Sequence, residues 1–576
     1  AEVVWRERGL ELSDVYDSLP TPTWAVWGGK SLALGAVVVA LLLVSIATGI
    51  GIQAWRGYFE FELGLYVQGL LFVVGVSFLL WAVLALFLQT ASNHRYLGML
   101  LMIVVFVVIQ AMSAWDWDHY LYRFGEAPPA PYSDMNGYGT FLTAVGWFYL
   151  YWGFFAVILL TLMHLLWVRG RDAGWKTRLV LARRRLTRPV AAVLAAAAVG
   201  FLAVGGYIFY NTNVLNEYVP GDVAEERQAR FEKLYKRYED LPQPKITSVY
   251  AEVDIYPEAR DVAIRGTYEL VNKTGEPLTA LHLTVDPEVT IEKLELPGAR
   301  LAEADDELGY YVYELEQPMA PGEARTLGYE LAVVTRGFRN HGALTSVVEN
   351  GTFFNNFQYF PNVGYNPGAE LEDPNDRRKH GLPPIQRMAD LDDADARQAN
   401  YLTAQADWLD FETVVCTSAE QIALAPGYLE REWVNDEGRR CFHYAMDAPI
   451  LGFWAYLSAD WQVERDSWNG VAIEIYHDEK HPYNVQRMIE AVKDSLDYFT
   501  ESFGPYQHRQ VRIVEFPRYA RFAQSFPNTI PFSESIGFIA RLEEDPEAID
   551  YVYYVTAHEV AHQWWAHQVI GGAVQG

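Results

Sequence analysis

Apolar residues in the first 210 positions form five long runs with few polar interruptions. They lie at about residues 31–53, 65–90, 97–112, 141–168 and 189–210. Most reach the ~20 residues that a helix needs to cross the ~30 Å hydrocarbon layer of a bilayer. The third run is short, and we expect its helix to extend to Trp115. Buried helices of a large soluble core are the alternative, but five such runs cluster here and none follows. We therefore predict five membrane spans within residues 31–210.

Basic residues predict the orientation of these spans. The loop 169–188, "RGRDAGWKTRLVLARRRLTR", holds eight Lys and Arg and one Asp, and short basic loops stay in the cytoplasm. The loop 113–140, with a single Arg, then lies outside. The first run begins only at residue 31, behind a charged stretch, so it is not a cleaved signal peptide. Residues 1–30 are therefore expected to be a cytoplasmic juxtamembrane segment, and everything after about residue 211 to be extracytoplasmic.

The polar pattern changes beyond the last run. Residues 222–240 have the spacing of a charged amphipathic helix, which predicts a helical stalk or linker over 211–244. From Lys245 the apolar period becomes two, as in "ITSVYAEVDIYP" and "LTALHLTVDP". Short strands continue to about residue 460, with turns between them. We predict an all-β domain over 245–462, a sandwich or a saddle.

Helical spacing returns near residue 480. "NVQRMIEAVKDSLDYFTESFG" has one apolar face, with Asn484 as its expected cap and Gly504-Pro505 as its stop. "QVRIVEF" predicts a strand. "DPEAIDYVYYVTAHEVAHQWWAH" predicts a second helix, with Asp545 as N-cap and Pro546 at the first helical position. Residues 463–576 thus begin an α+β domain, so the chain is multidomain: polytopic α-helical, then all-β, then α+β.

Charge divides the chain in the same way. Residues 1–210 carry 14 Lys and Arg against 12 Asp and Glu, whereas the remainder carries 31 against 61. Such an acidic second part argues against nucleic-acid binding, which needs the opposite sign. The chain has two cysteines, Cys416 and Cys441, both in this part. They could pair outside the cytoplasm, or stay as two separate half-buried thiols.

A metal-binding pattern lies near the C-terminal end, in "TAHEVAHQWW". Residues four apart on a helix differ by about 40° around its axis, so His558 and His562 project from one face. Both imidazoles can then approach one zinc ion, at about 2.0–2.1 Å. Glu559 is turned by about 100° and can act as general base on a water molecule that zinc makes more acidic. His567 points off this face and is expected to be structural or exposed. Catalytic zinc normally has three protein ligands, and the sequence supplies two.

The segment "HEVAHQWWAHQV" resembles the zinc aminopeptidases of the membrane alanyl aminopeptidase family, the gluzincins. The resemblance implies a β-saddle domain followed by a thermolysin-like catalytic domain, over about 245–576. It also implies a third zinc ligand, a glutamate roughly 18–20 residues after His562, and a transition-state tyrosine further downstream. Both fall beyond Gly576. The chain is therefore expected to stop before its site is complete, and this fragment to be inactive.

A second glutamate supports this resemblance. Family members carry a Gly-x-Met-Glu-Asn motif on an edge strand, and its glutamate lies 24 residues before the first histidine. Glu534, within "PFSES" at 531–535, has this spacing to His558, although the glycine, methionine and asparagine are replaced. In the family this glutamate holds the free α-amine of the peptide, through a charge-assisted hydrogen bond. An exposed loop carboxylate is the alternative.

The first 168 residues resemble the permeases of the ABC type-two exporter family. The resemblance rests on the charged cluster Trp5-Arg6-Glu7-Arg8, on Pro20-Thr21-Pro22, on Gly29-Lys30 at the membrane edge, and on the span pattern. It implies contact with an ABC ATPase subunit and two spans before the present first residue. A plain amphipathic juxtamembrane helix is the alternative for residues 1–30.

Together, the two halves resemble the bacterial ABC permease/aminopeptidase fusion proteins. The expected function is that of a zinc aminopeptidase anchored in the bacterial cytoplasmic membrane, which removes N-terminal residues from peptides outside the cytoplasm. Its expected partners are a peptide, the lipid bilayer and an ABC ATPase subunit, and no nucleic acid. Two alternatives stay open: a transporter subunit whose peptidase-like domain binds peptides without cleaving them, and a membrane anchor without a transport role.

Overall fold

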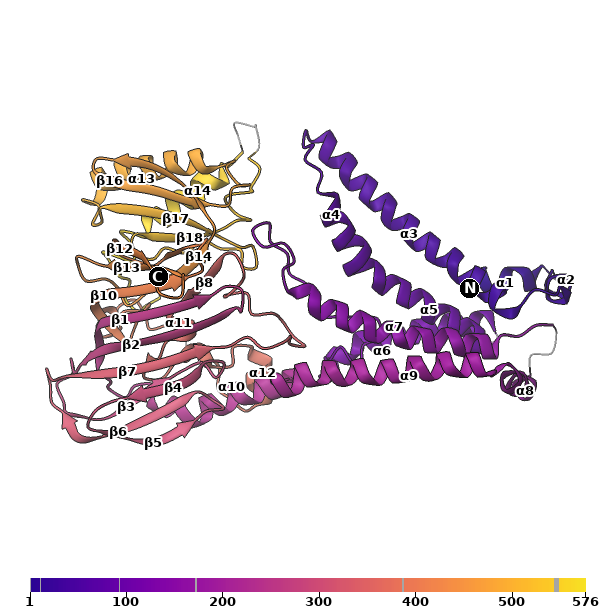
Figure 1. Cartoon of the computed structure of the whole chain (residues 1–576). Coiled ribbons are helices and arrows are strands. Elements are labelled where there is room, and N and C mark those ends of the chain that lie inside the picture. Colours follow the sequence, from indigo (N-terminus) through magenta and orange to yellow (C-terminus); the bar gives the residue numbers. More distant parts are fainter. Residues whose placement is uncertain are drawn as a thin grey trace. The chain divides into compact units, whose positions relative to one another are not determined.

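The computed structural model describes residues 2–10, 12–92, 94–170, 174–385, 388–542 and 548–575. The chain divides into two compact units (Figure 1). The first comprises Ala1–Ala130, Thr140–Asp222 and Arg336–Ala343. The second comprises Pro131–Gly139, Val223–Thr335 and Leu344–Gly576. Each unit thus includes a short segment from the middle of the other unit's sequence.

The first unit is helical. Its elements are α1 (Glu2–Gly9), α2 (Ser13–Ser18), α3 (Thr23–Trp55), α4 (Leu63–Tyr66), the π-helical η1 (Val67–Val74), α5 (Gly75–Ser92), α6 (Arg95–Met112), η2 (Ser113–Trp115), α7 (Phe141–Leu166), α8 (Trp175–Arg185), α9 (Arg188–Phe209) and η3 (Tyr210–Leu215).

Five helical stretches within the described residues are long and apolar enough to cross a membrane. They are Thr23–Trp55, Leu63–Ser92, Arg95–Trp115, Phe141–Leu166 and Arg188–Leu215. Each corresponds to one of the five predicted apolar runs, and the third extends to Trp115 as expected. The fourth ends at Leu166, two residues before the predicted limit, because the backbone of Trp167 is extended. By length and composition, these helices are compatible with a membrane protein.

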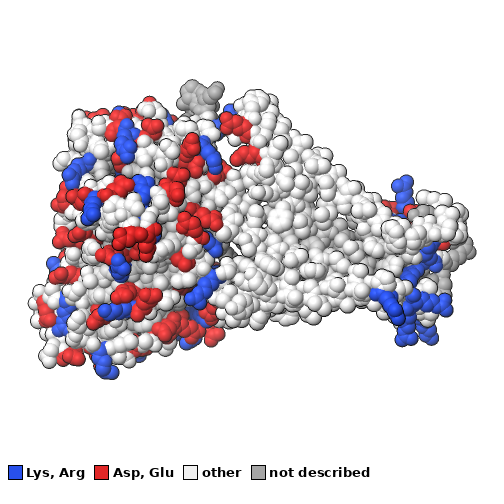
Figure 2. Space-filling view, in the orientation of Figure 1, with Lys and Arg blue, Asp and Glu red and all other residues white. Residues whose placement is uncertain are grey.

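Burial within this unit separates side chains that pack from side chains that face outward. On α7, Phe148, Trp152 and Leu159 are buried in the core that the helices share. On α3, Leu32 and Leu41 are exposed, as expected for a helix in contact with lipid. Figure 2 shows a broad surface over the helices without charged side chains and a group of basic side chains at the end where α8 lies.

The second unit is rich in sheet. Its strands are β1 (Lys245–Tyr256), β2 (Asp261–Val271), β3 (Leu278–Thr284), β4 (Thr290–Glu295), β5 (Ala299–Asp305), β6 (Tyr310–Met319), β7 (Ala324–Val333), β8 (Thr352–Asn355), β9 (Asn362–Val363), β10 (Ala406–Thr417), β11 (Ile422–Leu424), β12 (Tyr428–Val434), β13 (Arg440–Ala445), β14 (Ala455–Ala459), β15 (Gln462–Trp468), β16 (Val471–His477), β17 (Gln510–Phe516) and β18 (Thr529–Ser533). Its helices are α10 (Gly221–Tyr235), which begins two residues before the unit does, η4 (Lys236–Tyr238), α11 (Asn356–Tyr359), η5 (Pro367–Ala369), α12 (Pro374–Lys379), η6 (Ala396–Gln398), α13 (Val485–Phe503) and α14 (Tyr551–Ala561).

The strands form four sheets. A seven-stranded sheet has the order β12-β13-β10-β1-β2-β7-β4, and smaller sheets have the orders β11-β14-β8, β5-β6-β3-β9 and β15-β16-β17-β18. Neighbours are antiparallel except β1 with β10, β16 with β17 and β17 with β18. Along β1, alternate residues such as Val249, Ala251 and Val253 are buried, which is the period-two pattern seen in the sequence. Cys416 and Cys441 lie opposite each other on β10 and β13 and form a disulfide.

The last sheet and its two helices share a separate core. Val492 and Leu496 of α13 pack in this core with Val552 and Val560 of α14. Asn484 stands at the N-cap position of α13, but its side chain donates to backbone oxygens of residues 537, 538 and 540 instead of capping the helix. This expected cap was therefore wrong, because a tertiary contact uses the side chain.

The second predicted helix, α14, is shorter than its apolar pattern suggests. It begins at Tyr551, and Asp550 caps it by accepting a hydrogen bond from the Tyr553 N–H at 2.9 Å. The expected cap Asp545 and Pro546 lie outside the described residues. The helix ends at Ala561, and His562 keeps a helical backbone as its C-cap. The turns that follow are fixed by the buried side chain of Gln563, whose amide bonds to the segment before β18.

Candidate functional site

The two histidines of the predicted metal site project together from the end of α14. The Nε2 atoms of His558 and His562 are 3.2 Å apart. Two imidazole nitrogens bound to one tetrahedral zinc ion would be about 3.3 Å apart at the usual Zn–N distance. The backbone N–H of His562 donates to the His558 carbonyl at 3.3 Å, so the helical spacing of the pair is kept although α14 itself ends at Ala561.

A backbone contact sets the orientation of the second imidazole. The Nδ1 atom of His562 lies 3.0 Å from the Trp565 carbonyl oxygen. A carbonyl can only accept, so Nδ1 carries the proton and Nε2 is left with its lone pair. Metal-binding histidines in proteins are commonly held by this kind of contact.

Glu559 lies on the buried side of the same helical turn. Its side chain is 5 % exposed, and its Oε2 atom has no hydrogen-bond partner. Burial raises the pKa of Glu559 to about 7. A buried carboxylate oxygen without a partner is unusual in a folded protein, and such atoms mark a bound ion, a water molecule or a catalytic role. The environment of Glu559 is thus that of a proton acceptor rather than of a surface carboxylate.

The donor set at this position suits zinc but is incomplete. Two convergent imidazole nitrogens, beside a buried carboxylate, match the ligand types and base of catalytic zinc sites. Within the described ranges, no third His, Cys, Asp or Glu comes close enough to complete a metal-binding group with His558 and His562.

His567 has a structural environment. It is buried, and its Nε2 lies 2.9 Å from the Ser525 carbonyl oxygen. Burial is the main cause that lowers its pKa, to about 4, so the imidazole is neutral near pH 7. Of the two expectations for His567, structural or exposed, the structure therefore places it in the structural group.

Glu534 directly follows β18, the edge strand of its sheet, and is fully buried. Its Oε2 accepts from the Ser133 hydroxyl at 2.9 Å and from the Met135 N–H at 3.2 Å, and its Oε1 accepts from the Asp134 N–H at 3.1 Å. Burial raises the pKa of Glu534, and these hydrogen bonds oppose the rise. The alternative of an exposed loop carboxylate does not fit this environment.

A buried ion pair beside Glu534 was not anticipated from the sequence. His481 Nδ1 lies 2.6 Å from Glu515 Oε1, and the Asp478 N–H donates to Glu515 Oε2 at 2.6 Å. Burial raises the pKa of Glu515 to about 7. Burial lowers the pKa of His481, but the hydrogen bond and charge of Glu515 outweigh it, and the net pKa is raised. Atoms of His481, Glu515 and Glu534 lie within 4.8 Å of one another, so two carboxyl groups and one imidazole share this buried space.

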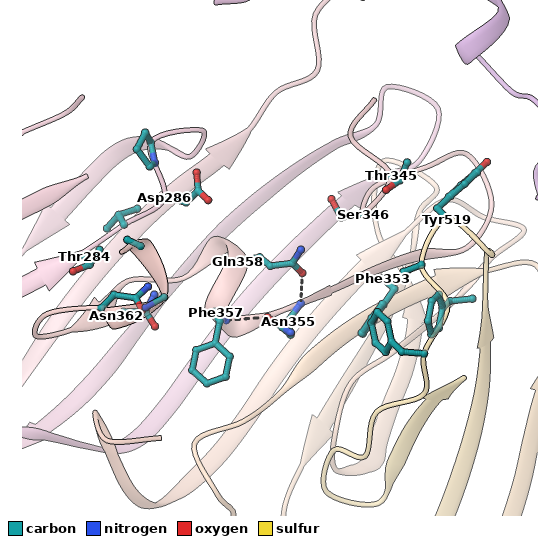
Figure 3. Close-up of a pocket in the computed structure, with 18 of the residues that line it drawn as sticks. Thr284, Asp286, Thr345, Ser346, Phe353, Asn355, Phe357, Gln358, Asn362 and Tyr519 are labelled. Carbon is teal, nitrogen blue, oxygen red and sulfur yellow. Dashed lines mark hydrogen bonds between the residues drawn. The ribbon is translucent and has the colours of Figure 1, made fainter. Parts of the chain in front are cut away.

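A cavity of about 730 Å³ opens within the second unit, next to the loop that follows β17. Phe353, Phe357 and Tyr519 are among the aromatic residues that line it (Figure 3). Amide side chains lie between them, and Asn355 and Gln358 fix each other's position through a capping box on α11. Its volume is in the range of pockets that hold small ligands. The loop that supplies Tyr519 also bonds to strand β18, since the Ser533 hydroxyl donates to the Ala520 carbonyl.

Comparisons with known proteins found similarity among solved structures only. No family model matches the sequence, and no curated protein matches it. Among solved structures, the chain is similar to a mutant M1 zinc metallopeptidase from Deinococcus radiodurans, with a TM-score of 0.37 and 13% identity. The similarity covers 57% of this chain and 66% of that one. The chain thus spans slightly less than two thirds of the length of that metallopeptidase.

Proposed function

We propose that the second unit is a zinc peptidase that acts on the N-terminus of peptides. The observation that carries the proposal is the convergence of the His558 and His562 Nε2 atoms at 3.2 Å, with the buried, unpartnered Glu559 oxygen on the same helical turn. His558 and His562 would hold the metal. By the family resemblance, a third ligand is expected from a glutamate after Gly576.

Zinc, when bound, would polarise the scissile carbonyl and make a water molecule more acidic. Glu559 then accepts a proton from the attacking water at its free Oε2 atom and delivers it to the leaving amine. A base whose pKa lies near the working pH is suited to both steps. The Trp565 carbonyl, which accepts the Nδ1–H of His562, would keep the His562 Nε2 lone pair available for the metal.

Glu534 would select a free N-terminus. A carboxylate in a buried environment binds an ammonium strongly, because neither group is well solvated there. An aminopeptidase, rather than an endopeptidase, is therefore the activity proposed.

The first unit would anchor this peptidase in a bacterial cytoplasmic membrane. The five apolar helices and the basic loop 169–188 support a topology with the peptidase outside the cytoplasm. An exporter-type permease role with an ABC ATPase partner follows from the resemblance of residues 1–168.

The test uses a chain that continues past Gly576 and includes the expected third ligand. We expect zinc-dependent cleavage of aminoacyl fluorogenic substrates. Glu559→Gln should retain zinc in metal analysis while turnover falls by about 10²–10⁴-fold, because it removes the base and no ligand. His558→Ala and His562→Ala should lose both zinc and turnover.

Amine recognition has its own comparison. Glu534→Gln should reduce the preference for free over N-acetylated substrates, whereas Glu501→Gln, an exposed carboxylate on α13, should leave it unchanged. Zinc-loaded protein without cleavage, or a fully active Glu559→Gln variant, would refute the peptidase and favour a peptide-binding transporter subunit.

A further inference from the structure

The carboxylate of Glu534 is covered by a segment that comes from far away in the sequence. Residues 131–139, "PYSDMNGYG", lie between helices η2 and α7 but belong to the second unit. We call them the 131–139 turn. Three of the donors on Glu534 come from it: the Ser133 hydroxyl and the backbone N–H groups of Asp134 and Met135. Glu534 has no exposed surface in this arrangement.

The 131–139 turn is shaped to bind an anion. The Ser133 N–H donates to the Gly137 carbonyl at 3.1 Å and closes a tight reversal, which Gly137 completes with a φ of +60°. This reversal directs the successive N–H groups of Asp134 and Met135 to the same carboxylate. Consecutive backbone N–H groups in such a turn form a concave anion-binding site.

The turn presents Glu534 with three hydrogen-bond donors, as many as an α-ammonium group carries. A peptide amine and the turn would therefore use the same lone pairs of the same two oxygens. With the turn in place, no part of the Glu534 side chain is accessible to a ligand. Since Glu534 is proposed above to hold the free amine, that function requires the turn to leave the carboxylate first.

Anchors away from Glu534 hold the turn in position. The Met135 side chain is buried in the core of the β-sheets, and the Asn350 side chain donates to the Met135 carbonyl at 2.9 Å. The Asn136 side chain donates to the Tyr519 hydroxyl at 3.2 Å, and Tyr519 also lines the 730 Å³ cavity. The anchors can be weakened separately from the contacts to Glu534, so the two roles of the turn can be tested apart.

We infer that the 131–139 turn is an autoinhibitory cover, which competes with the N-terminal amine of a peptide for the Glu534 carboxylate. The inference rests on the proposed amine recognition by Glu534, and it adds the regulation of that site. A protein whose binding-competent form is only partly populated binds with an affinity reduced by that fraction. Loosening the turn should therefore tighten the binding of a free amine and leave the binding of a blocked amine unchanged.

Hydrogen–deuterium exchange of the whole chain in lipid nanodiscs tests the inference without catalysis. The probes are tri-alanine at saturation and N-acetyl-tri-alanine as its matched control. We expect tri-alanine alone to speed the exchange of the Asp134 amide, which loses its acceptor. The Met135 amide should respond less, because it also donates to the Ser133 hydroxyl at 3.2 Å. The Ser133 amide, bonded inside the turn to Gly137, should stay protected and serves as the internal control.

Calorimetry on variants of the 131–139 turn shows whether the turn weakens or strengthens the binding of tri-alanine. Ser133→Ala and Asn136→Ala should each tighten tri-alanine binding, by up to roughly tenfold for each lost hydrogen bond. Asn136→Ala removes the bond to Tyr519, whereas Ser133→Ala removes both the bond to Glu534 and the bond from the Met135 N–H. Tyr138→Phe, in the same turn, leaves the contacts of Glu534 unchanged and should have no effect. Ser133→Thr keeps a hydroxyl and should behave as the wild type does.

Three outcomes overturn the inference, and they differ in whether amine recognition by Glu534 is also refuted. Tri-alanine could bind through Glu534 while the Asp134 and Met135 amides keep their protection, or Ser133→Ala could weaken tri-alanine binding. In either case the turn is a fixed part of the site that orients Glu534. If Glu534→Gln binds both probes as the wild type does, amine recognition fails together with the cover. Absence of zinc-dependent cleavage would refute the peptidase alone, because exchange and calorimetry measure binding.

Discussion

Substitution of Gln563 should show whether the fold holds His558 and His562 in place as a metal site or whether the two histidines lie together by chance. Gln563 follows His562 directly and is fully buried. Its side chain donates to the Ser525 hydroxyl at 2.6 Å and to the Phe526 carbonyl at 2.8 Å, and it accepts from the Asn528 N–H at 3.0 Å. The Gln563 side chain thus links the C-terminal end of α14 to the segment 525–528, which leads into β18 and Glu534.

The expected loss of stability in Gln563→Ala depends on which partners can find a substitute. The Phe526 carbonyl already accepts a second bond, from the Thr529 N–H, and the Ser525 hydroxyl can rotate. The Asn528 N–H cannot compensate in either of these ways, because Asn528 is fully buried and its backbone is held at a φ of +51°. A buried donor left without a partner costs about 1–3 kcal/mol. With the lost packing of the side chain, we expect a decrease of about 2–4 kcal/mol in the free energy of unfolding.

Thermal unfolding of the purified protein measures this decrease. At an unfolding entropy of about 2.1 cal/mol/K per residue, a unit of about 350 residues shifts its midpoint by about 1–1.5 °C per kcal/mol, so the unfolding midpoint of the second unit should fall by about 2–6 °C. Gln568→Ala is the matched control, since Gln568 is only half-buried and makes one long contact, to the Pro505 carbonyl at 3.4 Å. Its free energy of unfolding should change by less than about 0.5 kcal/mol.

Zinc binding provides the second measurement on the same two variants, in the chain with the expected third ligand. Gln563→Ala should weaken zinc affinity, because the backbone that carries His562 is no longer held, whereas Gln568→Ala should not. If Gln563→Ala is as stable as Gln568→Ala and binds zinc equally well, the link between α14 and the segment before β18 has no part in forming the site.

Three further predictions concern the rest of the chain. In intact cells, an engineered cysteine near residue 260 should be labelled by an impermeant thiol reagent and one in loop 169–188 should not; the opposite pattern would reverse the orientation of the spans. Because Cys416 and Cys441 form a disulfide, the unreduced protein should show no free thiol, and reduction should lower its stability by about 3 kcal/mol; two titratable thiols would contradict the pairing. Burial lowers the pKa of His508 to about 3, below its unfolded value, so the unfolded state binds the extra proton and stability should fall as the pH drops below about 6.5. Between pH 6.5 and 5, His508→Gln should therefore lose about 1.5 kcal/mol less than the wild type in thermal or urea unfolding, and equal losses would contradict a neutral, buried His508.

Local patterns in the sequence predicted the elements of this fold well. The five apolar runs correspond to five helices, and "ITSVYAEVDIYP" is strand β1, because span length and strand alternation are set by neighbouring residues. The pairing of His558 with His562 also follows from local spacing. The capping role expected of Asn484 failed because a tertiary contact with residues 537–540 uses its amide.

The surroundings of the candidate site could not be predicted in the same way. Ser133 and Glu534 are 401 positions apart, and no periodicity reports such a contact. His481 and Glu515 lie on different elements and acquire their shifted pKa values only when folding buries them together. The sequence did hold one local signal of the 131–139 turn, the Asn-Gly pair at 136–137, which is typical of tight reversals. That signal predicts a turn but not what the turn binds.

The long separation between the 131–139 turn and its acceptor sets the order of events during synthesis. At about 5–20 residues per second, the ribosome reaches Glu534 roughly 20–80 s after Ser133. Throughout this interval the Met135 side chain and the Asp134 N–H lack the core and the carboxylate that they contact in the folded unit. The segment 336–343, which belongs to the first unit, is completed some 200 residues before Glu534. The helical unit can therefore mature while the chain is still on the ribosome, whereas the second unit can bury its turn only after Glu534 has been made. A chain that stalls between these two points would leave the turn accessible to proteases.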